Sequence, residues 1–254
     1  MQNLDTKSLF VALVGRPNVG KSSLLNLLVG EKVAIVTSKP QTTRTRITGI
    51  LTRAKTQFVF LDTPGIHKPR TKLGERMAKA TSDSVAEVDV AVMLFEPYGE
   101  LTESERSLIE ELRAKKMPSY AVVNKMDTLK RAQDFEIRKE FLDSFGVFEE
   151  ILPLSVYEKK GDQVLLDKIE RYAIESPHYF PDDSYTDMPE KVLVAEIVRE
   201  KMLLHLYDEI PHGTAVMVER FKERSEKDII DIDINIYVKR KVIRGLSLVK
   251  AEQC

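Results

Sequence analysis

One short loop near the start of the chain constrains the fold more than any other feature. Residues 15–22 read GRPNVGKS and fit the pattern G-x-x-x-x-G-K-[ST], between an apolar run, Leu9–Val14, and a helical pattern, Lys21–Val29. Glycines let such a loop wrap closely around phosphates, and its N–H groups and the following helix N-terminus attract anions. We expect nucleotide phosphates to be bound by Gly15, Pro17, Asn18, Val19, Gly20, Lys21, Ser22 and Ser23.

Apolar runs alternate with helical patterns over the first 175 residues, which predicts an α/β domain with a mostly parallel sheet. The expected strands are Leu9–Val14, Gln57–Leu61, Val88–Phe95, Tyr120–Val123 and Ile151–Leu154. The expected helices are Lys21–Val29, a helix opened by the capping-box pair Thr102 and Glu105 and running to about Lys116, and Asp162–Ile174.

A metal site is expected next to the phosphate loop. Asp62-Thr63-Pro64-Gly65 ends an apolar strand, where an acid can hold the metal through water and the Gly65 N–H can contact a γ-phosphate. Thr43 lies in the polar segment before the next strand, and the adjacent Thr42 is an equal alternative. We expect Mg²⁺ to be held by Ser22, Thr43 and Asp62.

The motif Asn124-Lys125-Met126-Asp127 follows another expected strand and predicts which nucleotide base the protein binds. An aspartate accepts two hydrogen bonds from N1–H and the exocyclic amine of guanine, which adenine cannot supply. Asn124 would tie this loop to the phosphate loop, and Ser155-Val156-Tyr157 would add backbone contacts to the base oxygen. Together the motifs predict a protein that binds GTP and GDP and hydrolyses GTP.

The residue that orients water in many GTPases is a glutamine just after the glycine of the metal-strand motif. Here that position holds Ile66, so hydrolysis should be slow or assisted. Asn18 is a candidate, because the loop resembles those of GTPases in which K⁺ lies beside the phosphates. Arg44, Arg46 and His67 are further candidates. We expect Lys21, Thr43, Gly65 and Asn18 to act in catalysis.

Bulk composition excludes several classes of protein. The formal net charge is −1, which argues against an indiscriminate nucleic-acid binder. The single cysteine, Cys254, allows neither a disulfide framework nor a thiolate metal site, which suggests a reducing cytosolic compartment. The first eight residues are polar and carry no apolar signal segment. No apolar run approaches the ~20 residues of a membrane span, and peripheral membrane contact remains open.

The composition changes after residue 175. Residues 176–189 hold three prolines and four aspartates and are expected to form a linker. A helix is expected over Glu190–Asp208 and strands over Thr214–Phe221 and Asp228–Val238. In the last strand isoleucines alternate with polar residues, which predicts one buried face.

Three segments resemble the Era family of bacterial ribosome-assembly GTPases: Gln41-Thr42-Thr43-Arg44, residues 62–67 (DTPGIH) and residues 195–201 (AEIVREK). The similarity runs from about Phe10 to about Val238. The resemblance implies a GTPase domain (1–175), a linker (176–189) and a type II KH domain (190–254) that binds the 3′ end of small-subunit ribosomal RNA during 30S-type subunit maturation. It also implies a cytoplasmic location with some contact at the inner membrane, and we expect a monomer.

The end of the chain departs from that family. A KH domain clamps nucleotides with a G-x-x-G loop, and none follows Val238 here. The KH domain is therefore expected to be partial. Loss of one base near Lys241 would produce this tail, and a divergent tail is the alternative; the gene sequence would distinguish them. Basic residues after Val238 could give weak RNA attraction.

Two functions follow from these features. The first is a GTP-hydrolysing switch that acts in small-subunit assembly by binding its RNA. The second is a GTP-binding module whose output is protein or membrane contact, with RNA binding lost. A truncated product that binds GTP without assembly work is a variant of the second.

Overall fold

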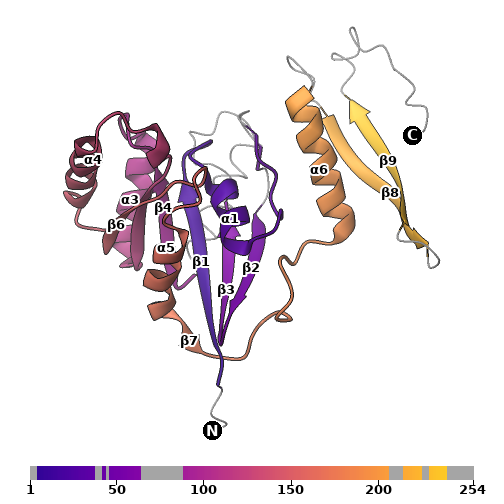
Figure 1. Cartoon of the computed structure of the whole chain (residues 1–254), viewed down its shortest axis with the longest axis horizontal. Coiled ribbons are helices and arrows are strands. Elements are labelled where there is room, and N and C mark those ends of the chain that lie inside the picture. The colour runs from indigo at the N-terminus through magenta and orange to yellow at the C-terminus, as the bar shows by residue number, and fades with distance from the viewer. Residues whose placement is uncertain are drawn as a thin grey trace. The chain divides into compact units, whose positions relative to one another are not determined.

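The computed structural model describes residues 5–37, 42–43, 46–63, 88–205, 214–224 and 229–238. The chain divides into two compact units, Met1–Met188 and Pro189–Cys254, which are described separately (Figure 1). Within these described ranges, no helix combines the length and apolar character needed to cross a membrane.

The first unit is built on a sheet whose main path runs β2-β3-β1-β4-β5-β6. The strands are β1 Lys7–Gly15, β2 Ile47–Arg53, β3 Thr56–Asp62, β4 Val90–Phe95, β5 Ser119–Val123, β6 Glu150–Pro153 and β7 Ile174–Glu175. Pairs along the path are parallel except β2 with β3, and β7 pairs antiparallel with the start of β1. The predicted α/β class with a mostly parallel sheet is confirmed.

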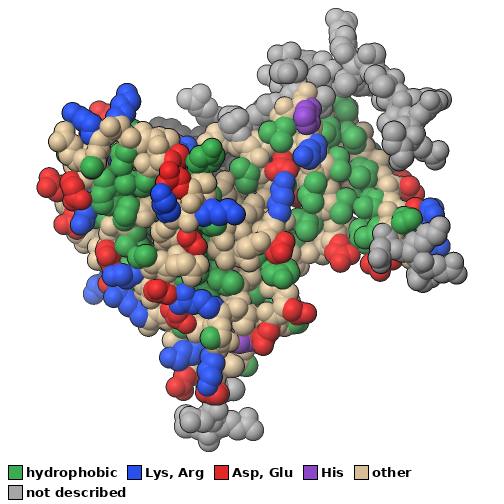
Figure 2. Space-filling model, in the orientation of Figure 1, with side chains coloured by type: hydrophobic (Ala, Val, Ile, Leu, Met, Phe, Trp, Pro, Cys, Tyr) green, Lys and Arg blue, Asp and Glu red, His purple; other side chains and the backbone are tan. Residues whose placement is uncertain are grey.

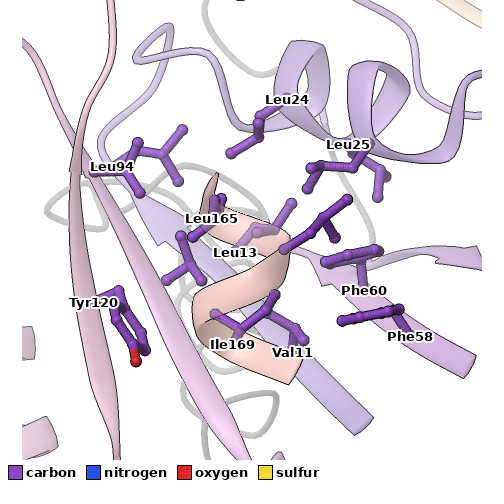
Figure 3. Close-up of a cluster of buried hydrophobic side chains, with 14 of the residues drawn as sticks. Val11, Leu13, Leu24, Leu25, Phe58, Phe60, Leu94, Tyr120, Leu165 and Ile169 are labelled. Carbon is purple, nitrogen blue, oxygen red and sulfur yellow. The ribbon is translucent and has the colours of Figure 1, made fainter. Parts of the chain in front are cut away.

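Helices cover both faces of this sheet (Figure 1). Helices α1 (Lys21–Val29) and α5 (Asp162–Ile169) pack on one face, and α3 (Glu103–Lys115) and α4 (Gln133–Asp143) on the other. Figure 3 shows the first cluster, with Leu24 and Leu25 of α1 and Leu165 and Ile169 of α5 directed toward strand residues. Because the strands are buried on both faces, they appear in the sequence as continuous apolar runs.

Three elements differ from the sequence-based expectations. Strand β2 was not expected, because its pattern ITGILTR mixes threonine and glycine with the apolar residues. Helix α4 was not expected either, since two of its three buried residues are the charged Asp134 and Arg138. The helix expected over Asp162–Ile174 ends at Ile169; Ile174 and Glu175 instead pair with Ser8 and Lys7 of β1.

The segment expected to be a linker lies against the first unit. Gln57 of β3 accepts hydrogen bonds from the backbone N–H groups of Tyr179 and Phe180 and donates to the Phe180 carbonyl. The Ile50 N–H of β2 donates to the Tyr185 carbonyl at 2.8 Å. Residues up to Met188 therefore belong to the compact unit that contains the sheet.

The second unit contains α6 (Glu190–His205), β8 (Thr214–Arg224) and β9 (Ile229–Val238). The two strands are antiparallel, with Val218 opposite Ile234 and Phe221 opposite Ile232. The face predicted to be buried is only partly covered among the described residues, since Ile230 and Ile236 are 48% and 49% exposed. Figure 2 shows hydrophobic side chains gathered over these strands.

Candidate nucleotide-binding site

The loops that carry the predicted motifs follow the carboxyl ends of β1, β3, β5 and β6, where ligands bind in open α/β sheets. Two glycines shape the phosphate loop. Gly15 and Gly20 have φ angles of +143° and +107°, which side-chain-bearing residues rarely adopt. A Cβ on Gly15 would lie 2.7 Å from the Leu94 carbonyl oxygen, and one on Gly20 would overlap the Asn124 amide nitrogen. Any larger residue would deform the loop.

Lys21 is a buried cation inside that loop, with 5% of its surface exposed. Its Nζ donates to the carbonyl oxygens of Gly15 and Arg16, each at 3.0 Å. Burial lowers the pKa of Lys21 to about 8, an effect opposed by the negative charges of Asp62 and Glu105. The loop thus holds an ammonium group where phosphate oxygens can replace backbone carbonyls as its partners.

Three oxygen-bearing side chains meet at the first turn of α1. The Ser22 hydroxyl donates to Asp62 Oδ2 at 2.5 Å and lies 3.0 Å from the Thr43 hydroxyl. The Thr42 hydroxyl bonds instead to that of Thr37, at 2.7 Å. Of the two candidate threonines, Thr43 is therefore the one placed with Ser22 and Asp62.

This corner fits a magnesium ion. Asp62 is fully buried, and its Oδ1 has no hydrogen-bond partner within the described structure. Burial raises the pKa of Asp62 to about 6, although Lys21 and the Ser22 hydrogen bond both lower it. A buried carboxylate oxygen without a partner is costly, and Mg²⁺ prefers oxygen ligands from one or two protein groups together with phosphates.

The expected base site is tied to the phosphate loop by Asn124. This buried side chain donates to the Val19 carbonyl at 2.8 Å and accepts from the Val156 N–H at 3.2 Å. Asp127 is exposed, and its Oδ1 accepts a 2.5 Å hydrogen bond from the buried Ser155 hydroxyl. Ser155 therefore orients the carboxylate while leaving it open to a ligand.

The remaining predicted residues fall into three groups. The Thr63 hydroxyl donates to the Leu13 carbonyl at 2.9 Å, so its side chain is turned into the sheet. Asn18 is exposed at the loop tip with φ +62°, and Tyr157 is 88% exposed. Pro64, Gly65, Ile66, His67, Arg44 and Gln41 lie outside the described residues.

Sequence reasoning missed Glu96, the first residue after β4. Its carboxylate forms ion pairs with Arg16 of the phosphate loop and Lys125 of the base loop. Burial lowers the pKa of Lys125, and the nearby positive charge of Arg16 lowers it further. Glu96 thus joins two cations that repel each other. An acid at the carboxyl end of a buried parallel strand was the signal that could have identified it.

We expect Glu96→Gln to release GDP about 3- to 10-fold faster, because the amide keeps the shape but no longer offsets the two cations. The effect stays modest since these side chains are partly exposed and screened. Stopped-flow release of a fluorescent GDP analogue at low and high salt would measure it. Glu100→Gln, an exposed acid on the same loop, is the matched control. Equal rates in both variants would contradict a role for Glu96.

Comparison with known proteins places the chain in a family. A family model described as "50S ribosome-binding GTPase" matches residues 10–125. GTPase Era of Clostridioides difficile (strain 630) is 47% identical over 245 residues, 96% of this chain and 82% of that protein. The chain belongs to the Era family. GTPase Era of Alkaliphilus metalliredigens (strain QYMF) is 44% identical over 97% of this chain and 83% of its own length.

Solved Era structures agree with this assignment. An Era crystal structure in complex with MgGDPNP and nucleotides 1506–1542 of 16S ribosomal RNA has a TM-score of 0.84 and 33% identity, covering 93% of this chain and 80% of that one. An Aquifex aeolicus Era variant bound to GDP and AlF4⁻ has the same values. As a member of the Era family, this chain is a GTPase that hydrolyses GTP to GDP and phosphate.

Proposed function

We propose that this Era-family GTPase couples its GTP cycle to binding of small-subunit ribosomal RNA during assembly of a 30S-type subunit. One observation carries the proposal. The match to the RNA-bound Era spans 93% of this chain, so it must extend well into the second unit, which makes up its last 66 residues. A match confined to the GTPase unit would support GTP binding and hydrolysis but not RNA binding.

In this proposal the phosphate loop binds the nucleotide phosphates, and Lys21 stabilises the negative charge that develops on them. Ser22, Thr43 and Asp62 hold Mg²⁺, which neutralises phosphate charge when bound. The base is bound by the loop that contains Asp127, with Asn124 and Ser155 fixing its position. The metal assignment is supported by the partnerless Oδ1 of Asp62.

We also propose that Asn18 supports a K⁺ ion beside the phosphates. Asn18 is exposed at the tip of the loop, and Ile66 has no hydrogen-bonding group with which to orient water. GTP hydrolysis should then be about 10-fold faster in KCl than in NaCl at equal ionic strength. Asn18→Ala should lose this difference. Equal rates in the two salts for the unmodified chain would show that no K⁺ site operates.

Residues 190–254 are proposed to be a partial type II KH domain, following a GTPase domain (1–175) and a segment (176–189) that joins them. The order helix, strand, strand in α6, β8 and β9 supports this assignment. The Era resemblance further implies a cytoplasmic monomer with peripheral contact at the inner membrane, and these points remain predictions.

The RNA proposal is tested by titrating the chain, loaded with a non-hydrolysable GTP analogue or with GDP, against an RNA that carries the small-subunit 3′ end. A scrambled RNA of equal length is the control, at fixed salt because phosphate contacts are salt-dependent. We expect at least about 10-fold tighter binding to the 3′-end RNA in the GTP-like state. A second candidate is a GTP-binding module without RNA binding, which is considered because residues 239–254 contain no G-x-x-G. It predicts equal, weak affinity for both RNAs.

A further inference from the structure

A cavity of about 580 Å³ lies beside α4, away from the residues assigned to the nucleotide. Pro97 and Tyr98 of the β4–α3 loop form one wall, and Ile137, Arg138 and Phe141 of α4 form another. Helix α4 is at the left edge of Figure 1. The volume lies within the range of small-molecule pockets, roughly 300–1,000 Å³, whose walls are mostly apolar with a few polar groups.

Arg138 is the polar group of this cavity whose bonding is incomplete. It is 7% exposed, yet the one hydrogen bond that it makes to a residue described by the structure runs from Nη1 to the Gly99 carbonyl, at 2.9 Å. Within the described structure its Nε is buried without a partner, and its Nη2 has none either. Burial lowers the pKa of the Arg138 guanidinium, Arg16 adds to this effect and Glu105 opposes it. A buried cation with so few partners favours an added anion.

The guanidinium is also held in a fixed position. Its carbon lies 5.8 Å from the centre of the Phe95 ring and 5.5 Å from that of Phe141. Cations in such positions over aromatic rings are attracted to them and lose mobility. Because Arg138 lines the cavity and already packs against these rings, binding a ligand there should cost little side-chain entropy.

The other charged groups around the cavity leave it positive. Asp134 is already satisfied: it accepts from the Tyr98 hydroxyl at 2.8 Å and pairs with Arg131 at 2.9 Å. These contacts hold the pKa of the Asp134 carboxyl below its usual value. The ammonium of Lys130 makes no ion pair with any residue that the structure describes. With Arg131 and Asp134 offsetting each other, Lys130 and Arg138, whose charge Glu105 offsets in part, remain to attract an anion.

We propose that this cavity is a binding site for a small organic carboxylate with an aromatic or branched aliphatic body. The carboxylate bonds to Arg138 Nη2 and is attracted by Lys130. The apolar body fills the space between Pro97, Ile137 and Phe141. Because Pro97 directly follows Glu96, which joins the phosphate and base loops, an occupant would lie next to the nucleotide machinery without entering it.

The test uses the GDP-loaded full chain with ¹³C-labelled isoleucine methyl groups, and 3-phenylpropionate as the probe. NMR titration should show a saturable shift of the Ile137 methyl signal, assigned by Ile137→Val, with a Kd of roughly 1–5 mM. The neutral probe 3-phenylpropanamide should bind at least about 5-fold more weakly, since it lacks the charge that Arg138 and Lys130 attract.

Two variants distinguish specific binding of the carboxylate from nonspecific binding of the probe to an apolar surface. Arg138→Met should remove the preference for the carboxylate over the amide. Lys130→Gln, at an exposed position that does not contribute to the core, should reduce that preference about 2- to 3-fold. Unchanged GTP hydrolysis would verify that each variant is folded. The proposal is overturned if the Ile137 signal shows no saturable shift, or if the carboxylate and the amide bind equally to the unmodified chain.

Discussion

Replacing Asp127 with asparagine is expected to change the base that this GTPase accepts, from guanine to xanthine. Guanine presents two donors, N1–H and the exocyclic amine, to the two carboxylate oxygens. In the variant one oxygen becomes an NH₂ group that faces the guanine amine donor-to-donor. Xanthine carries a carbonyl oxygen at that position, and an amide can pair with it. A site built to hydrogen-bond its substrate rejects an analogue that cannot form those bonds by roughly 10⁴–10⁵.

The geometry around Asp127 makes this substitution a clean test. The Ser155 hydroxyl donates to Oδ1 of Asp127, and an asparagine oxygen can keep that bond. The loop is further held by Asn124, which bonds the Val19 carbonyl and the Val156 N–H. The substitution should therefore alter recognition of the base while the loop keeps its position.

Competition binding of GDP and xanthosine diphosphate would measure the exchange of preference. We expect GDP affinity to fall by at least about 10³-fold and xanthosine diphosphate affinity to rise by at least about 10²-fold. Asp143→Asn, an exposed aspartate at the end of α4, is the matched control and should change neither. If the Asp127 variant retained GDP affinity, the base would have to be recognised elsewhere.

The nucleotide motifs could be predicted from the sequence because their chemistry demands particular residues at short spacings. Gly15 and Gly20 are needed for close backbone approach, and Lys21 and Asp62 for charge. The buried strands were recognisable for a related reason, since burial on both faces requires continuous apolar runs. Both the motifs and the apolar runs consist of residues that are close together in the sequence.

The elements that were missed depend on contacts between distant residues. Glu96 joins Arg16 and Lys125, which are 80 and 29 residues away, and nothing near it in the sequence marks either partner. Arg138 is buried between Phe95 and Phe141, although a charged residue at that position suggests an exposed helix face. The composition of residues 176–189, with three prolines and four aspartates, predicted a linker, whereas the segment is held by contacts to distant residues such as Gln57 and Phe10.

The second large effect is expected at Lys21. Lys21→Met should lower the rate of GTP hydrolysis by about 10²–10³-fold, the loss typical when one preorganised donor is removed from developing negative charge. Methionine has a similar length and no charge, so the buried volume stays filled and the sheet is not disturbed. Single-turnover hydrolysis with enzyme in excess would separate this loss from a loss of binding.

We expect Lys21→Met to weaken GTP binding less than it slows GTP hydrolysis. Lys21 donates to the Gly15 and Arg16 carbonyls, and it must give up these bonds to reach phosphate oxygens, which offsets part of its contribution to GTP binding. GTP affinity should fall by about 10-fold, while the hydrolysis rate falls further, because the interaction strengthens as charge develops in the transition state. Lys139→Met, an exposed lysine on α4, should change neither quantity. Equal losses in affinity and rate would instead mean that Lys21 binds ground state and transition state alike, and another cation would then be needed to account for catalysis.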